Sequence, residues 1–90
     1  MRIKTDKVHF TRAERIFARI LLENHIPFKT KVKIGGREID FLIGNKAIEI
    51  DGHEQASEKN VELAALGYVP IHFSNQEVYK SRDKLINKIK

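Results

Sequence analysis

The sequence predicts an α/β domain in which a mixed four-stranded sheet is flanked by helices, in the order αβββαβα. Apolar residues recur at helical spacing in three segments and alternate with polar residues in the strand segments. The pairs Gly35-Gly36 and Gly44-Asn45 separate three of these strand segments at hairpin spacing. Because a chain of 90 residues has room for one hydrophobic core, we expect residues 1–90 to form a single domain.

The first helix is expected over residues 12–25. Thr11 and Glu14 have the spacing of a capping box, in which each side chain bonds the backbone N–H of the other residue. Apolar side chains then recur every three or four positions, and Pro27 ends the helix because it has no N–H to donate.

Three strands are expected over residues 28–34, 37–43 and 46–51, joined by the two glycine turns. A second helix over residues 54–66 follows and is closed by Gly67 at the C-cap position.

A fourth strand is expected over residues 68–73, and a last helix over residues 75–90. The third and fourth strands are too far apart in sequence for a hairpin, so we expect a crossover that makes them parallel. The sheet is therefore mixed.

The segment 37–53 holds three carboxylates, Asp40, Glu49 and Asp51, among residues that otherwise favour burial. A two-residue turn at Gly44-Asn45 places Asp40 directly opposite Glu49, with Cβ atoms about 5 Å apart. Asp51 points to the same face as Glu49 because side chains alternate along a strand. Like charges at this spacing favour binding of a divalent cation.

Carboxylate oxygens are the ligands that Mg²⁺ prefers, and the backbone carbonyl of Ile50 is a further candidate ligand. We therefore expect Mg²⁺, or Mn²⁺ in its place, and no small-molecule cofactor. A two-residue turn at Gly35-Gly36 would also place Lys31 opposite Asp40. Such a lysine could orient a water molecule or neutralise charge during phosphodiester hydrolysis, or it could simply pair with Asp40.

Charge is unevenly distributed along the chain, whose formal net charge is +5. Residues 37–62 hold seven acids and three bases, a charge of −4, so the remainder carries +9. A basic body around an acidic centre suits a polyanion, although lysine-rich surfaces also serve solubility. The absence of cysteine excludes a disulfide framework and a thiolate metal site. The N-terminal segment lacks a signal-peptide core and no apolar run approaches the length of a membrane span, so we expect a cytoplasmic protein.

The order of these motifs resembles the PD-(D/E)XK restriction-endonuclease-like superfamily, and more narrowly its Vsr-like branch. The resemblance rests on Asp40 before a hairpin, the stretch IEIDG at 48–52 and the stretch LGYVPIHF at 66–73, and it extends over residues 11–85. It implies a restriction-endonuclease-like core and a metal-dependent DNA endonuclease. Asp40 and Glu49 become metal ligands, whereas Asp51 occupies the position of the usual lysine, a departure from the common pattern.

The resemblance also suggests which residues assist the reaction. His53 becomes the candidate general base or ligand of a metal-linked water, and Gln55 and Lys59 are candidates to replace the missing lysine. Glu14 resembles the first-helix Glu that often completes such sites, although the capping box by itself explains it fully. His72 on the fourth strand could lie near the site, although a satisfied core or edge histidine is the simpler explanation.

The expected partner is DNA. So small a domain offers little contact surface, so we also expect a homodimer or a larger partner that supplies target recognition. The alternative function is a non-catalytic nucleic-acid-binding domain of the same fold, and a third is an interaction domain stabilised by a metal.

Overall fold

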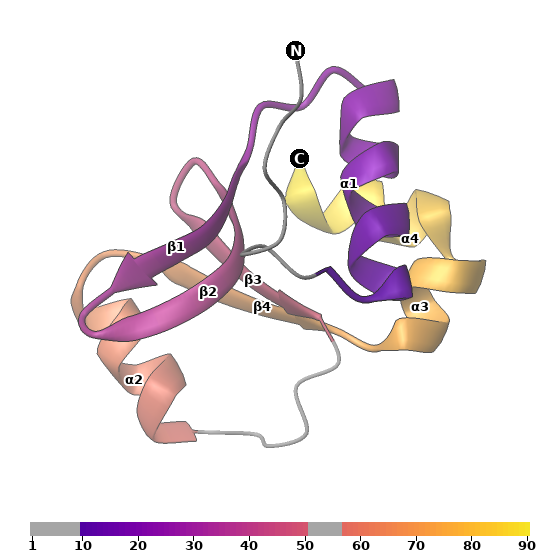
Figure 1. Ribbon diagram of the computed structural model, residues 1–90. Helices are drawn as coiled ribbons and strands as arrows, with labels where there is room; N and C mark the ends of the chain where they lie inside the picture. Colours follow the sequence, from indigo (N-terminus) through magenta and orange to yellow (C-terminus); the bar gives the residue numbers. More distant parts are fainter. Residues whose placement is uncertain (1–9, 51–56) are drawn as a thin grey trace, which may run out of the picture.

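A four-stranded sheet in the order β1-β2-β3-β4 forms the centre of the molecule, with helices on both of its faces (Figure 1). The computed structural model describes the backbone of residues 10–50 and 57–90 and the side chains of residues 10–50 and 60–90. The strands are β1 (Lys29–Ile34), β2 (Arg37–Ile43), β3 (Lys46–Ile50) and β4 (Val69–Phe73). The helices are α1 (Arg12–Glu23), α2 (Ser57–Ala65), α3 (Asn75–Lys80) and α4 (Arg82–Ile89).

The strand pairing confirms the expected mixed sheet. β1 and β2 are antiparallel, as are β2 and β3, and β3 and β4 are parallel. The parallel pair follows from the α2 crossover, since a tight turn can join only antiparallel neighbours.

Two clusters of buried side chains form the core, one on each face of the sheet. The larger cluster, here called the α1 cluster, joins α1, α3 and α4 to the sheet and contains Phe17, Phe41 and Phe73. The Phe17 ring lies 4.9 Å from the Phe41 ring and 5.7 Å from the Phe73 ring. The smaller, here called the α2 cluster, packs Leu63 of α2 against Ile34, Ile39 and Ala47.

Helix α1 begins at the expected capping box. The Glu14 N–H donates to Thr11 Oγ1 at 3.1 Å, and the Thr11 N–H donates to Glu14 Oε1 at 2.9 Å. The helix ends at Glu23, two residues earlier than expected. His25 has a φ of 56° and Ile26 donates its N–H to the Leu21 carbonyl, so a Schellman motif ends the helix before Pro27 is reached.

Helix α2 ends in the same way at the glycine that the sequence indicates. Gly67 has a φ of 94°, and Tyr68 donates its N–H to the Leu63 carbonyl at 2.9 Å. The expected start at residue 54 lies outside the described residues.

The last helix is not continuous, which corrects the expectation of one helix over residues 75–90. Ser81 has φ −124° and ψ 53°, outside the helical region, and separates α3 from α4. Serine is a weak helix former, so tertiary packing can break the helix there at low cost. Val78 of α3 and Leu85 of α4, on either side of the break, belong to the same core cluster.

No helix in the part of the chain that the structure describes is long and apolar enough to cross a membrane.

Candidate active site

The β2–β3 hairpin has the register that brings Asp40 to Glu49. Its paired residues are Ile43 with Lys46, Leu42 with Ala47, and Phe41 with Ile48. One further step in this register places Asp40 opposite Glu49. Backbone pairing gives way to a side-chain contact at this point, because the Ile50 N–H donates to Asp40 Oδ2 at 2.9 Å. The Asp40 carboxylate therefore lies against the end of β3.

Lys31 of β1 approaches the other oxygen of the same carboxylate. Its Nζ lies 3.9 Å from Asp40 Oδ1 and 3.5 Å from Glu14 Oε1. The pairs Val32 with Ile39 and Thr30 with Phe41 flank it, which confirms the register expected from the Gly35-Gly36 turn.

Lys31 also interrupts its strand. Its φ is 50°, in the left-handed region that costs about 1–2 kcal/mol for a residue with a Cβ. Residues two or four apart on a regular strand share a face. Here Phe28, directly before β1, packs against the α1 cluster, whereas Val32, four residues later, packs against the α2 cluster. The strand therefore turns over around Lys31. The backbone strain lies at the residue whose ammonium contacts Asp40 and Glu14.

Strand β2 changes face at the corresponding position. Ile39 belongs to the α2 cluster and Phe41 to the α1 cluster, although they are two residues apart. Asp40 lies between them, where neither cluster encloses it fully.

Glu14 both caps helix α1 and contacts the Lys31 ammonium. It is a buried charged residue, 6% exposed, whose Oε1 accepts the Thr11 N–H and faces the Lys31 ammonium. The two readings of Glu14 that the sequence left open are thus compatible.

Burial is the main cause of an unusual pKa at Asp40. Loss of water raises the pKa of this carboxyl above its ordinary 3.8, and the Ile50 N–H, which favours the charged form, opposes that effect. The neighbouring carboxylates of Glu49 and Glu14 raise the pKa of Asp40 further, and the Lys31 ammonium lowers it. Asp40 therefore lies near two further acids, Glu14 and Glu49, and shares the Lys31 ammonium with Glu14.

Four of the expected site residues are not placed by the structure. Asp51, His53 and Gln55 lie outside the described residues, and Lys59 is in α2 with a side chain that is not described. Within residues 10–50 and 60–90, no three acidic or histidine side chains form a group that could hold a metal ion. The described part thus brings together Glu14, Lys31, Asp40 and Glu49.

His72 of β4 is a neighbour of the site, one of the two possibilities that the sequence left open for it. The parallel pairing of β3 with β4 makes His72 the register partner of Glu49. The signal was present in the sequence, since the crossover predicts parallel strands, but their register depends on how far α2 carries the chain.

A hollow of about 290 Å³ near the C-terminal end of β2 is not part of this site. Its lining residues, which include no acid, are Pro27, Phe28, Lys29, Leu42 and Gly44.

Comparison with solved structures identifies a similar catalytic domain. The homing endonuclease I-Bth0305I catalytic domain superimposes with a TM-score of 0.73 and 28% sequence identity, over 89% of this chain and 91% of that chain. No protein-family model and no curated protein sequence matches the chain. The protein therefore has an endonuclease-like core, and the similarity supports a nuclease-type function.

Proposed function

We propose that the protein is a metal-dependent DNA endonuclease of the Vsr-like type, with Asp40 and Glu49 as ligands of Mg²⁺. The observation that carries the proposal is the Asp40 carboxylate, half-buried at an interruption of the sheet beside two further acids. Burying like charges together destabilises a fold, so their retention in an endonuclease-like core favours a functional role.

The donor atoms present fit Mg²⁺, which is held in proteins by one or two carboxylates and keeps several waters. The N–H and C=O of one residue in an extended strand point towards the same neighbouring strand. Because Ile50 donates its N–H to Asp40, we expect its carbonyl oxygen on the Asp40 side as well. Asp51 follows directly and is the remaining proposed ligand. When bound, the metal would polarise a phosphoryl oxygen and lower the pKa of a bound water.

Lys31 has the position to neutralise charge on a phosphodiester bound beside Asp40. Glu14 holds the ammonium at 3.5 Å, and the Lys31 side chain is only 23% exposed, so its charge is partly shielded from water. A shielded, oriented cation stabilises a transition state more than a solvated one. His53, Gln55 and Lys59 remain the proposed groups that act on the attacking water.

The test is DNA cleavage by the purified protein. Supercoiled plasmid, branched DNA and single strands are incubated with Mg²⁺, Mn²⁺ or EDTA. We expect cleavage that EDTA abolishes and that Asp40→Asn and Glu49→Gln each reduce on the order of 100-fold or more. Glu38→Gln is the matched control, because Glu38 is an exposed acid on the same strand as Asp40.

Full activity of Asp40→Asn or Glu49→Gln would refute the assigned site. DNA binding without cleavage under every metal condition would instead favour the alternative, a non-catalytic nucleic-acid-binding domain. Cleavage of both strands would support the proposed homodimer, since one small domain carries one site.

A further inference from the structure

The solvent side of α1 carries three arginines, Arg12, Arg15 and Arg19, here called the arginine stripe. At 100° per residue their side chains lie within about 60° around the helix axis. All three are exposed, whereas the buried residues of the helix project from other sides. The three arginines and Ile16 line a shallow hollow of about 350 Å³.

Two of these arginines are held in place by the protein. The Arg12 guanidinium carbon lies 5.8 Å from the centre of the Tyr79 ring, within the range of a cation–π contact. Arg15 Nη1 donates to the Phe10 carbonyl at 3.2 Å. Each contact leaves most guanidinium N–H groups available while it limits side-chain motion, which lowers the entropy cost of binding an anion.

The charge of the stripe is not neutralised by acids in the described part of the chain. No carboxylate there forms an ion pair with the three arginines, whereas Arg37 and Arg82 pair with Glu62 and Glu23. Glu14, the acid in the first turn of α1, is buried and faces Lys31. Glu23, one turn beyond Arg19 on the same face, pairs with Arg82, so the stretch from Arg12 to Arg19 is a concentrated positive surface.

The stripe begins beside the candidate active site. Phe10 connects the two, since its carbonyl accepts from Arg15 and its ring centre lies 5.3 Å from Lys31 Nζ. From Arg12 to Arg19 the helix rises about 10 Å. One strand of duplex DNA carries a phosphate about every 3.4 Å along the axis, so this length corresponds to about three phosphate spacings along that axis.

We propose that the arginine stripe binds the backbone phosphates of the DNA strand that leads into the active site. Arginine suits this partner because its planar fork donates two parallel hydrogen bonds to a phosphate. The inference rests on the proposed function in that DNA is the substrate, but it concerns affinity and not cleavage.

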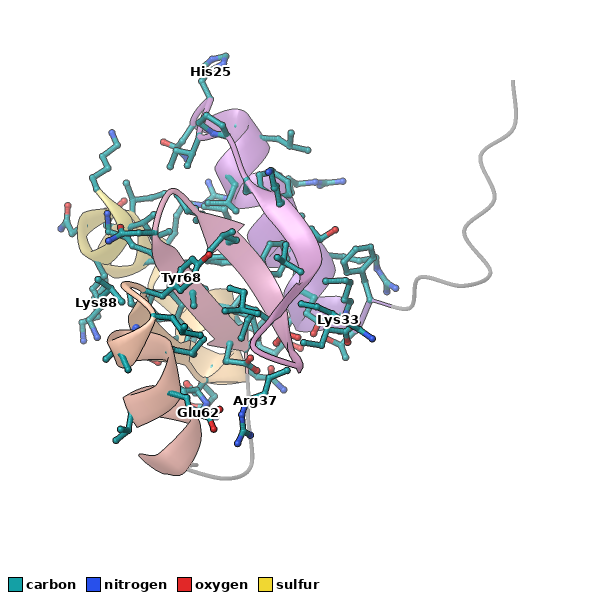
Figure 2. The ribbon with its side chains drawn as sticks, turned by 90° about the vertical axis from the view of Figure 1, so that its left-hand side faces the viewer. His25, Lys33, Arg37, Glu62, Tyr68 and Lys88 are labelled. Carbon is teal, nitrogen blue, oxygen red and sulfur yellow. The ribbon has the colours of Figure 1, made fainter. Side chains whose placement is uncertain are left out.

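The test measures binding without cleavage. The wild-type chain and the variant Arg12→Gln/Arg15→Gln/Arg19→Gln are titrated with fluorescent duplex DNA in EDTA at several salt concentrations. The control variant, Lys84→Gln/Lys88→Gln/Lys90→Gln, removes the same charge from α4 and its C-cap. That helix begins beside the far end of α1, where Arg82 pairs with Glu23, and Lys88 lies across the molecule from Lys33 of β1 (Figure 2).

Loss of three phosphate contacts should reduce the slope of log K against log salt by about 2.7 and weaken binding at 0.1 M salt more than tenfold. The control should bind within about threefold of wild type. The double variant Arg15→Gln/Arg19→Gln keeps the Arg12–Tyr79 contact, so it gives a binding result even if the triple variant unfolds; it should lose about 1.8 of the slope.

Equal losses of DNA affinity in the stripe and control variants would overturn the inference. So would a slope of log K against log salt that the stripe variant leaves unchanged. Neither outcome would affect the cleavage result. Absence of DNA binding by the wild-type chain would also overturn it. The proposed nuclease function is judged separately, by cleavage and its dependence on Asp40.

Discussion

Lys31 offers the sharpest test of what stabilises the candidate site, because it combines a strained backbone with an ammonium shared between Glu14 and Asp40. Lys31→Met removes the ammonium and keeps most of the side-chain volume. Lys31→Gly removes the ammonium as well but relieves the left-handed φ of 50°. The two variants therefore separate the electrostatic cost from the backbone strain.

The magnitude follows from the distances. Two unit charges at 4 Å attract by about 4 kcal/mol at an effective dielectric constant of 20, and Lys31 lies at 3.5 Å and 3.9 Å from its acids. Desolvation of the ammonium and partial exposure offset much of this, so we expect Lys31→Met to lower the free energy of unfolding by about 1–2 kcal/mol. Glycine tolerates the left-handed φ, so Lys31→Gly should be about 1 kcal/mol more stable than Lys31→Met.

The assay is urea unfolding at pH 7 without metal, and Lys33 supplies the matched control. Lys33 is exposed, lies two residues further along β1 and is not among the residues with positive φ. Glycine in an ordinary strand is destabilising, so Lys33→Gly should be less stable than Lys33→Met. The order of the Gly and Met variants should thus reverse between the two positions.

The same stability order of the Gly and Met variants at Lys31 and Lys33 would refute the strain argument. A Lys31→Met variant no less stable than Lys33→Met would refute the electrostatic one.

Three further predictions concern the acid, the core and the surface. Because the pKa of Asp40 is raised in the folded state, the charge at Asp40 costs stability as pH rises from its ordinary 3.8 through the raised value. The stability of Asp40→Asn relative to wild type should therefore increase over this window and then level off, as urea unfolding in EDTA would measure; a constant difference would contradict it. Phe17→Ala should lower the free energy of unfolding by about 3–5 kcal/mol, since Phe17 is fully buried against two other rings; a cost below 1 kcal/mol would disprove this packing. Glu62→Gln should cost less than about 1 kcal/mol in the same assay, because its ion pair with Arg37 at 2.7 Å is exposed (Figure 2); a larger loss would show that this surface pair is structural.

Local chemistry allowed the sequence by itself to determine the order of the elements and the register of the hairpins. The Gly44-Asn45 turn predicted the pairing of Ile43 with Lys46, which the structure has. The Thr11–Glu14 capping box and the Gly67 cap are likewise interactions between residues close in the chain. The pairing register of the two hairpins then sufficed to place Lys31 opposite Asp40 and Asp40 opposite Glu49.

Only the tertiary structure decided features that depend on contacts between distant segments. The break at Ser81 interrupts a segment whose apolar spacing is that of one continuous helix, so the spacing does not mark it. The left-handed Lys31 and the change of face at Asp40 run against strand preference, so only surrounding packing can hold them. The approach of Glu14 to Lys31 depends on how α1 crosses the sheet, a distance that propensity and periodicity do not contain. The sequence thus determined which residues could meet, whereas tertiary packing decided how closely they do and at what cost in strain and desolvation.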